Sequence, residues 1–160
     1  NDGYEEGFKM LVSKLQTKDK LVVLSVRDNA NGWCVLDTIA WLGWNGTEPL
    51  AYLMEGIQPH ELYTVLKTRD NRGETIIHHF VMMDIHKEVL EETMTTLTEY
   101  MQRELLDIED MQGRSPYYMA TEKLRSDETN AISHWVLQQY AKLQTSQILS
   151  MENVQGKRHL

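Results

Sequence analysis

The chain has 160 residues, 41% of them hydrophobic, and a formal net charge of −8 at pH 7. This length supports one domain with a core of its own, and no apolar run approaches the roughly 18 residues that a membrane span requires. The acidic charge argues against direct nucleic-acid binding, which usually needs a basic patch. A single cysteine, Cys34, excludes an internal disulfide framework and favours a reducing, intracellular location in the cytoplasm or the nucleus.

Taken in chain order, hydrophobic spacing predicts an all-α protein. In the first half we expect helices at about 4–17, 34–43 and 47–56, with a turn region between about 17 and 33 and a short turn or helix near 59–67. In the second half we expect helices at about 75–84, 86–104, 115–124 and 128–145. In the amphipathic segment at 86–106, helical spacing is shown by Val89, Leu90, Met94, Leu97, Met101 and Leu105.

A polar turn followed by glycine recurs along the chain. Each glycine follows an Asp or Asn by three positions, in the pairs Asn29 and Gly32, Asp70 and Gly73, Asp110 and Gly113, and Asn153 and Gly156. Asp or Asn opens such a turn by bonding its own backbone, and glycine supplies a position with positive φ. The glycine spacings are 41, 40 and 43 residues, so we expect an internal repeat.

Each turn also has matching neighbours. Upstream lie apolar residues, Leu24, Val65-Leu66, Leu105-Leu106 and Ile148-Leu149, and four positions downstream of the glycines lie Leu36, Ile77, Tyr117 and Leu160. In two copies a hydroxyl that would cap a helix follows the glycine: Thr75, and Ser115 with Pro116 at the first helical position.

These residues resemble the ankyrin repeat, whose signature reads D-x-x-G-x-T-P-L-H-x-A. The stretch from Asp70 to His78 matches at the Asp, Gly, Thr and His positions. The stretch from Asp110 to Ala120 matches at Asp, Gly, Pro and Ala, with Ser115 in place of Thr, and the stretches 29–40 and 153–160 match more weakly. The period of about 41 exceeds the usual 33 or so, which we interpret as longer second helices or an added short turn.

The resemblance implies an ankyrin-like helical solenoid with short β-turn fingers, made of about three repeats plus partial terminal units. Residues 1–160 would form a single domain and a fragment of a longer protein. In this interpretation Gly32, Gly73 and Gly113 shape the turns, and Ser115 and Pro116 start a helix. His78 would bond the capping Thr75, which is also a structural role.

The resemblance further implies a non-catalytic, monomeric module that binds and regulates another protein through its concave finger and helix surface, without a cofactor. The elongated units and acidic balance look most like regulatory arrays of the inhibitor-of-NF-κB type, while similar long repeats occur in cytosolic arms of TRP-type ion channels, and the sequence does not choose between them. The expected contacts are Asn31, Trp33, Asn71, Arg72, Glu74, His79, Gln112, Arg114 and Tyr118. Trp33, Trp41 and Trp44 lie within twelve residues of one another, which suggests an exposed aromatic anchor.

The alternative from another class is a metal-dependent enzyme that uses His79, His86 and Cys34. Adjacent helical residues such as His78 and His79 point about 100° apart, so they do not easily bind one metal ion, and no HExxH spacing is present. Cys34 has no nearby Lys or His in sequence to activate it, and we expect a small, partly buried residue. The sequence therefore predicts neither a catalytic residue nor a metal site.

The acidic charge is concentrated in residues 84–110, where nine acidic residues face two basic ones, a net charge of −7. One interpretation is a solvated helix face. The other is a docking surface for a basic segment of a partner, carried by Glu88, Glu91 and Glu92, which would act mainly on association rate and salt dependence.

Overall fold

The computed structural model describes residues 2–42, 52–84 and 87–156, and this part of the chain is all-α with no strand. Its first half contains α1 (Asp2–Ser13), α2 (Thr17–Ser25), α3 (Val35–Leu42) and α5 (Pro59–Leu66). Its second half contains α6 (Ile76–Met83), α7 (Lys87–Thr95), α8 (Glu99–Asp107), α9 (Pro116–Ser126) and α10 (Ala131–Gly156). None of the described helices combines the length and hydropathy that a membrane span requires.

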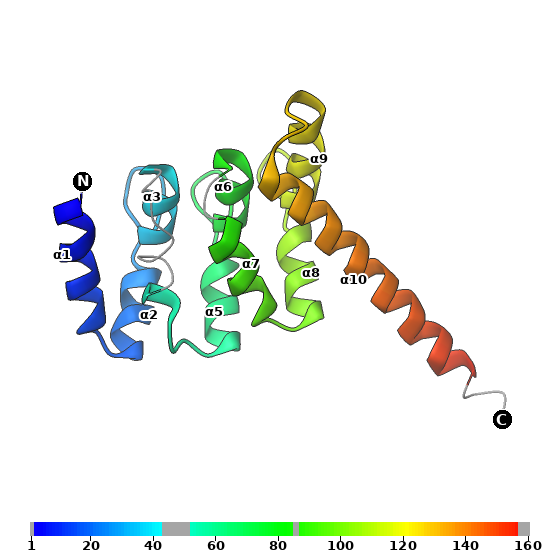
Figure 1. The fold of residues 1–160 in the computed structure, drawn as a ribbon, viewed down its shortest axis with the longest axis horizontal. Helices are drawn as coiled ribbons and strands as arrows, with labels where there is room; N and C mark the ends of the chain where they lie inside the picture. The colour runs from blue at the N-terminus through cyan, green and yellow to red at the C-terminus, as the bar shows by residue number, and fades with distance from the viewer. Residues whose placement is uncertain (1, 43–51, 85–86, 157–160) are drawn as a thin grey trace.

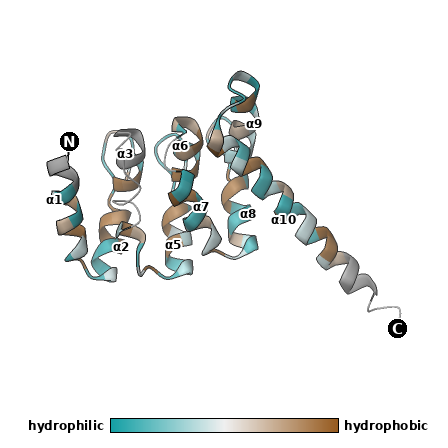
Figure 2. Cartoon of the chain, in the orientation of Figure 1, coloured by the Kyte–Doolittle hydropathy of each residue, from teal (hydrophilic) through white to brown (hydrophobic). Residues whose placement is uncertain are grey.

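The helices lie side by side in two rows (Figure 1). One row holds α3, α6 and α9, with α6 in contact with both of the others, and the other row holds α2, α5 and α8. The long helix α10 packs on α9 and α8 and crosses them diagonally. In Figure 2 the hydrophobic residues of α2 and α8 lie at the ends of these helices that face the first row. The core therefore lies between the two rows.

The predicted apolar positions before the turns form part of this core. Leu24, Leu66 and Leu106 are each no more than 1% exposed. The fourth copy of the pattern does not behave in this way, because Ile148 and Leu149 are 56% and 54% exposed. The residues after the turns differ as well, since Leu36 and Ile77 are buried while Tyr117 is 36% exposed.

The predicted turn at 153–156 is wrong, because α10 continues as a helix to Gly156. The helix predicted at 128–145 is α10, which begins at Ala131 and continues past 145 to Gly156. Asn followed three residues later by Gly is a weak turn signal when neither a helix cap nor packing supports it. Here the surrounding segment is rich in residues that tolerate a helix.

The predicted helix at 86–104 is divided into α7 and α8. Thr98 ends the intervening turn and caps α8, because its Oγ1 accepts a hydrogen bond from Met101 N at 3.3 Å. Leu97, which is 4% exposed, is buried in the turn itself. Leu97 thus stays in the core although the chain changes direction between α7 and α8. The segment expected to form one long helix therefore contains two shorter helices, Lys87–Thr95 and Glu99–Asp107.

The amino-terminal third also differs from expectation. The predicted helix at 4–17 ends at Ser13, and α2 occupies much of the region expected to be a turn. The short helix near 59–67 is confirmed as α5, which begins with a capping box formed by Gln58 and Glu61 and with Pro59 in its first turn. Most of the predicted helix at 47–56 lies outside the described residues, of which 52–54 are helical.

Candidate functional site

Three turns, at residues 28–33, 70–74 and 110–114, each connect a helix of one row to a helix of the other, and we call them the turn row. Gly32, Gly73 and Gly113 have φ angles of 74°, 76° and 73° in these turns. Only glycine adopts this left-handed region without strain. The positive φ expected from the sequence is therefore confirmed at all three positions.

An aspartate organises each turn. Asp70 Oδ1 accepts hydrogen bonds from the backbone N–H groups of Arg72 and Glu74, both at 2.8 Å. Asp110 Oδ1 accepts in the same way from Gln112 and Arg114, at 2.7 and 2.9 Å. These carboxylates satisfy backbone donors that the tight turn leaves without a partner.

The first turn is one residue longer than the sequence pattern suggested. The organising residue is Asp28 rather than Asn29, and its carboxylate accepts from the backbone N–H groups of Ala30, Asn31 and Trp33. The hydrogen bond from Asn31 N is the main cause that lowers the pKa of Asp28. The extra residue is not evident from the sequence, because Asn29 precedes Gly32 by three positions, as Asp70 and Asp110 precede their glycines.

Neighbouring turns are hydrogen-bonded to one another through their backbones. Asn71 N donates to Asn31 O at 2.8 Å, and Met111 N donates to Arg72 O at 3.0 Å. The Asn71 side chain adds a bond from Nδ2 to Ala30 O at 3.1 Å. The turn row is thus one connected strip of backbone, which limits how far one turn can move relative to the next.

His78 is the internal structural histidine that the sequence predicted. Its Nδ1 lies 2.9 Å from both Thr75 N and Thr75 Oγ1, and its Nε2 lies 3.0 Å from Arg114 O in the next turn. A backbone N–H must donate and a carbonyl must accept, so Nδ1 is the acceptor and Nε2 carries the proton. Burial lowers the pKa of His78, which agrees with a neutral ring.

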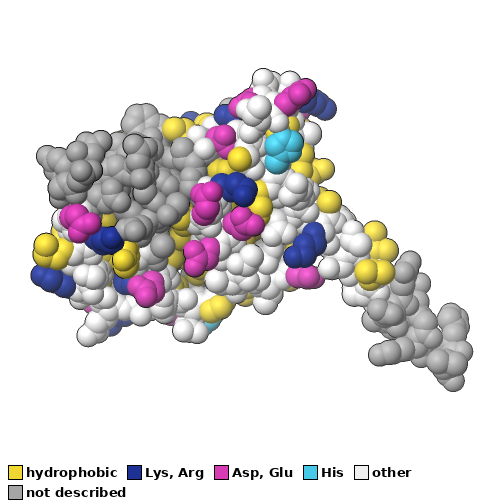
Figure 3. All heavy atoms as spheres, in the orientation of Figure 1, with side chains coloured by type: hydrophobic (Ala, Val, Ile, Leu, Met, Phe, Trp, Pro, Cys, Tyr) yellow, Lys and Arg dark blue, Asp and Glu magenta, His cyan; other side chains and the backbone are white. Residues whose placement is uncertain are grey.

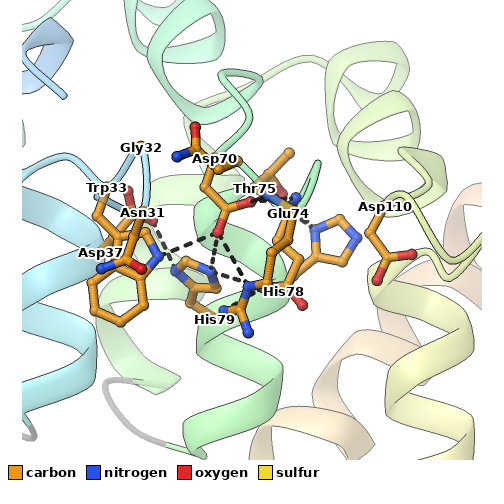
Figure 4. Close-up of polar contacts among 12 residues, drawn as sticks. Asn31, Gly32, Trp33, Asp37, Asp70, Glu74, Thr75, His78, His79 and Asp110 are labelled. Carbon is orange, nitrogen blue, oxygen red and sulfur yellow. Dashed lines mark hydrogen bonds and ion pairs between the residues drawn. The ribbon is translucent and has the colours of Figure 1, made fainter. Parts of the chain in front are cut away.

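His79 lies in the middle of a group of three carboxylates (Figure 4). Its Nδ1 is 2.9 Å from Asp37 Oδ1, and its Nε2 is 3.3 Å from Glu74 Oε2 and 3.5 Å from Asp70 Oδ2. The side chain is 4% exposed. Asp37 comes from α3, His79 from α6, and the other two carboxylates from the turn at 70–74.

Both ring nitrogens of His79 face carboxylate oxygens, so both must donate and the ring is an imidazolium cation. Burial by itself would lower the pKa of His79, but the hydrogen bond to Asp37 and the charges of Asp37, Glu74 and Asp70 outweigh burial and raise it. Burial would likewise raise the pKa of Asp37, and its bonds to His79 and to Cys34 N outweigh that effect and lower it. The ion pair is therefore stable in its charged form.

Three arginines surround the same carboxylates. Arg27 Nη1 is 2.8 Å from Asp37 Oδ2, Arg72 Nη2 is 2.7 Å from Glu74 Oε2, and Arg114 Nη2 is 3.3 Å from Glu74 Oε1. Arg114 also bonds Asp110. Four carboxylates, three guanidinium groups and the imidazolium cation give a cluster with no net charge, which is how buried charges are tolerated.

Asp70, Glu74 and His79 each offer a ligand atom within 4.8 Å of the other two, a spacing that would allow a metal ion. The donor set does not fit an ion as it stands. Asp70 Oδ2 already accepts from Trp33 Nε1 at 3.2 Å, the Glu74 oxygens accept from two arginines, and Nε2 of His79 carries a proton. A metal ion would have to displace these donors.

Cys34 is buried at the start of α3, beside Asp37. Burial and the Asp37 charge raise the pKa of the thiol to about 11. A nucleophilic cysteine needs a lowered pKa, so this environment is the opposite of an activated one. The third residue of the enzyme alternative, His86, lies outside the described residues.

The structure separates the predicted contact residues into two groups. Exposed on or beside the turn row are the side chains of Asn31, Asn71, Arg72, Gln112 and Tyr118. Arg114 and Trp33 are partly exposed, and both bind carboxylates of the cluster. Trp41 has no described side chain, and Trp44 lies outside the described residues.

Glu74 and His79, which were also expected to contact a partner, are buried instead. Exposure was expected because Glu74 was placed in a turn finger and His79 on the concave side of the helix that follows it. Instead, the Glu74 carboxylate forms ion pairs with Arg72, Arg114 and His79, and these contacts keep it buried. The ion pair between His79 and Asp37 keeps the His79 ring buried in the same way.

On α7, Glu88 and Glu92 are exposed, and Glu91 is partly covered and lies 3.3 Å from Lys87. Figure 3 shows acidic side chains gathered over the middle of the face that it draws, where α7 lies. The acidic segment therefore does present carboxylates at the surface.

Sequence reasoning missed several residues of the site. Asp37, Arg27 and Asp28 were not singled out, although Asp37 lies three positions after Cys34, where a carboxylate bonds back to the start of a helix. Its Oδ2 accepts from Cys34 N at 2.7 Å. Met111, which is 76% exposed at the tip of the third turn, was also missed.

Comparisons of the chain with protein-family models, with curated proteins and with solved structures found no match. The meaning of the site therefore depends on its own geometry. That geometry is a connected row of turns above a buried, neutralised cluster of charges.

Proposed function

We propose that this chain is a non-catalytic protein–protein interaction module of the ankyrin type, a helical solenoid that binds another protein through its turn row. One observation carries the proposal. Backbone hydrogen bonds join the three turns into a strip with exposed side chains, while every charged group of the cluster beneath it is paired.

The local geometry of the turns supports the repeated unit. All three turns have an aspartate that accepts backbone bonds and a glycine with positive φ, and each precedes a helix of the same row. The helices that precede the second and third turns, α5 and α8, begin at residues 59 and 99, with the 40-residue spacing of Gly73 and Gly113. His78 also bonds the next turn through Arg114 O, as a residue that connects successive units would.

Binding is favoured over catalysis because the cluster offers no free acid, base or nucleophile. His79 donates from both nitrogens, His78 is neutral and bonded on both sides, and the Cys34 thiol is protonated at neutral pH. A general base needs an unprotonated atom within reach of a substrate. None of these three groups supplies one.

The exposed side chains of the turn row have the chemistry of a contact surface. Asn31, Asn71 and Gln112 offer amide donors and acceptors, Arg72 a guanidinium group, and Met111 an adaptable apolar side chain. Tyr118, 49% exposed in the first turn of α9, adds an aromatic ring beside them. A rigid backbone under these side chains reduces the entropy lost on binding.

Affinity capture with quantitative mass spectrometry tests this function. The tagged chain is compared with a double variant of the turn row, Met111→Ser with Gln112→Ala. The matched control changes exposed residues elsewhere, Val22→Ser with Gln138→Ala. We expect at least one protein to be retained by the wild type and the control and lost by the turn-row variant, with all three chains melting at similar temperatures. Equal capture of every protein by both variants would contradict the proposed surface.

A further inference from the structure

A cavity of about 480 Å³ lies between residues 52–57, α5 and α7. Its volume is in the range of pockets that bind small molecules, roughly 300 to 1,000 Å³. The wall is mostly apolar and includes Tyr52, Met54, Ile57, Leu62 and Val89. We call it the α5–α7 cavity, and it shares no lining residue with the turn row.

Buried contacts hold two walls of the α5–α7 cavity in place. Lys20, which is 7% exposed, donates from Nζ to Tyr52 O at 2.6 Å and to Glu55 O at 3.1 Å. Thr93 Oγ1 lies 3.5 Å from Met54 Sδ and links α7 to the opposite wall. Since these bonds do not depend on a ligand, the cavity is formed before anything binds.

The two charged side chains that line the cavity are both acidic. Glu55 and Glu92 line it and have exposed side chains, and Glu88 lies one helical turn before Glu92. Among the described residues, neither Glu55 nor Glu92 has an ion-pair partner. The nearby lysines have other partners: Lys20 bonds the two carbonyls, Lys87 pairs with Glu91, and Lys9 lies over the Tyr52 ring and 3.9 Å from Glu6.

One lysine of the chain lies against an aromatic residue of the lining. Lys9 Nζ lies 5.3 Å from the centre of the Tyr52 ring, the geometry of a cation–π interaction. The Tyr52 ring therefore already has a cation beside it, which leaves the carboxylates of Glu55 and Glu92 to pair with a cation of a ligand. An anionic ligand would meet Glu55 and Glu92, and a neutral one would cover their carboxylates without pairing them, which costs free energy.

We propose that the α5–α7 cavity binds a segment of a partner protein in which a large apolar side chain lies next to a lysine or arginine. The apolar side chain fills the space between Met54, Leu62 and Val89, and the cation pairs with Glu92 and Glu55. The partner is a protein because the module is proposed to bind proteins, and in this respect alone the inference rests on the proposed function. The segment and the turn row occupy different surfaces.

Three synthetic peptides of about twelve residues serve as probes, and backbone amide NMR of the full chain at low salt is the readout. One peptide alternates leucine with lysine, one alternates leucine with glutamate, and one alternates serine with lysine. We expect only the leucine–lysine peptide to shift the amides of Ile57, Val89 and Thr93. Binding of the leucine–glutamate peptide at these amides, or no shift there with the leucine–lysine peptide, overturns the inference.

Two variants with equal net charge separate a specific site from general attraction to an acidic protein. Glu92→Lys should weaken binding of the leucine–lysine peptide by about tenfold, equivalent to roughly 1.4 kcal/mol. Glu128→Lys reverses an exposed charge on the segment before α10 and should leave the affinity unchanged. Equal weakening by both reversals would show nonspecific attraction and refute the site.

A third variant addresses the cavity itself. Thr96→Phe places a ring at an exposed position of the lining and should reduce peptide binding, while the amide spectrum elsewhere stays that of the folded protein. Unchanged binding by this variant would place the peptide outside the cavity. The turn-row variant Met111→Ser with Gln112→Ala should bind the peptide normally. The turn-row variant therefore tests the proposed function, and the variants Glu92→Lys and Thr96→Phe test this inference separately.

Discussion

His79 Nδ1 lies 2.9 Å from Asp37 Oδ1, a contact between α6 and α3 that no local sequence pattern predicts. The adjacent His78 points the other way and bonds Arg114 O in the next turn. The two histidines are thus held in opposite protonation states, one charged among carboxylates and one neutral between a backbone donor and a backbone acceptor. His79 thus connects α6 to α3, and His78 connects α6 to the turn at 110–114.

This contrast predicts a specific dependence of stability on pH. The pKa of His79 is raised in the folded protein, so the stability that it contributes is complete below the ordinary value of 6.5 and is lost as pH rises through the folded pKa. The pKa of His78 is lowered, so its contribution is present above 6.5 and is lost as pH falls through the folded pKa. We expect NMR titration to place the two histidines on opposite sides of 6.5.

Urea unfolding at a series of pH values checks the same point through stability. We expect the wild type to lose stability as pH rises above about 6.5, since the unfolded chain releases the His79 proton first. His79→Gln, which cannot carry the charge, should be less stable at pH 6 and should lack this decline. A wild-type profile that rises between pH 7 and 9 would mean that His79 is not an imidazolium cation.

The turn glycines give a prediction with an internal control. A side chain at Gly73 would place its Cβ 3.0 Å from Met111 N, whereas at Gly113 nothing lies within 4 Å of that position. Both substitutions to alanine incur the cost of the left-handed conformation, about 1 kcal/mol. Only Gly73→Ala also disturbs the bond from Met111 N to Arg72 O. We expect denaturant unfolding to show a clearly larger loss for Gly73→Ala.

Thr75→Ala should cost about 1 kcal/mol of stability through loss of the helix cap, and somewhat more because Thr75 Oγ1 also contacts His78 Nδ1. Ser115→Ala is the matched control, because Ser115 caps α9 through a single bond from Tyr118 N. The loss should be larger at Thr75, which is fully buried, and chemical denaturation measures both. An unchanged midpoint for Thr75→Ala would mean that this cap contributes nothing to stability.

Cys34 should be almost inert in the folded protein. With a pKa of about 11, only about one thiol in ten thousand is ionised at pH 7, and the side chain is 3% exposed. We expect a thiol reagent to modify Cys34 orders of magnitude more slowly in native protein than in urea. Rapid modification of the native protein would instead support the alternative of a reactive cysteine.

Addition of divalent metal ions should leave the melting temperature unchanged. A zinc ion at Asp70, Glu74 and His79 would displace the Arg72 and Trp33 donors and the Nε2 proton of His79. Binding to the folded state alone would raise the melting temperature with metal concentration. A saturable increase with one equivalent of zinc, abolished by Glu74→Gln, would restore the metal-dependent enzyme as a candidate.

The sequence by itself determined the features that depend on a few neighbouring residues. The positive φ of Gly73 and Gly113 and the caps at Thr75 and Ser115 were predicted from the residues themselves, whereas the bond between Thr75 and His78 was implied by the resemblance to the ankyrin repeat. The physical reason is that turn and cap geometry is set within about four residues, where donors and acceptors must find partners close by. The all-α class followed in the same way from helical spacing.

Only the tertiary structure decided which residues are hidden and where longer helices break. His79 is buried because Asp37, 42 positions earlier in the chain, lies against it, and Glu74 is buried because Arg72, Arg114 and His79 converge on its carboxylate. The amphipathic pattern runs unbroken from α7 into α8, yet the helix breaks near Leu97, and α10 continues through the expected turn at 153–156. In each case the outcome depends on free energies of packing and charge pairing between segments far apart in the chain, which local patterns do not encode.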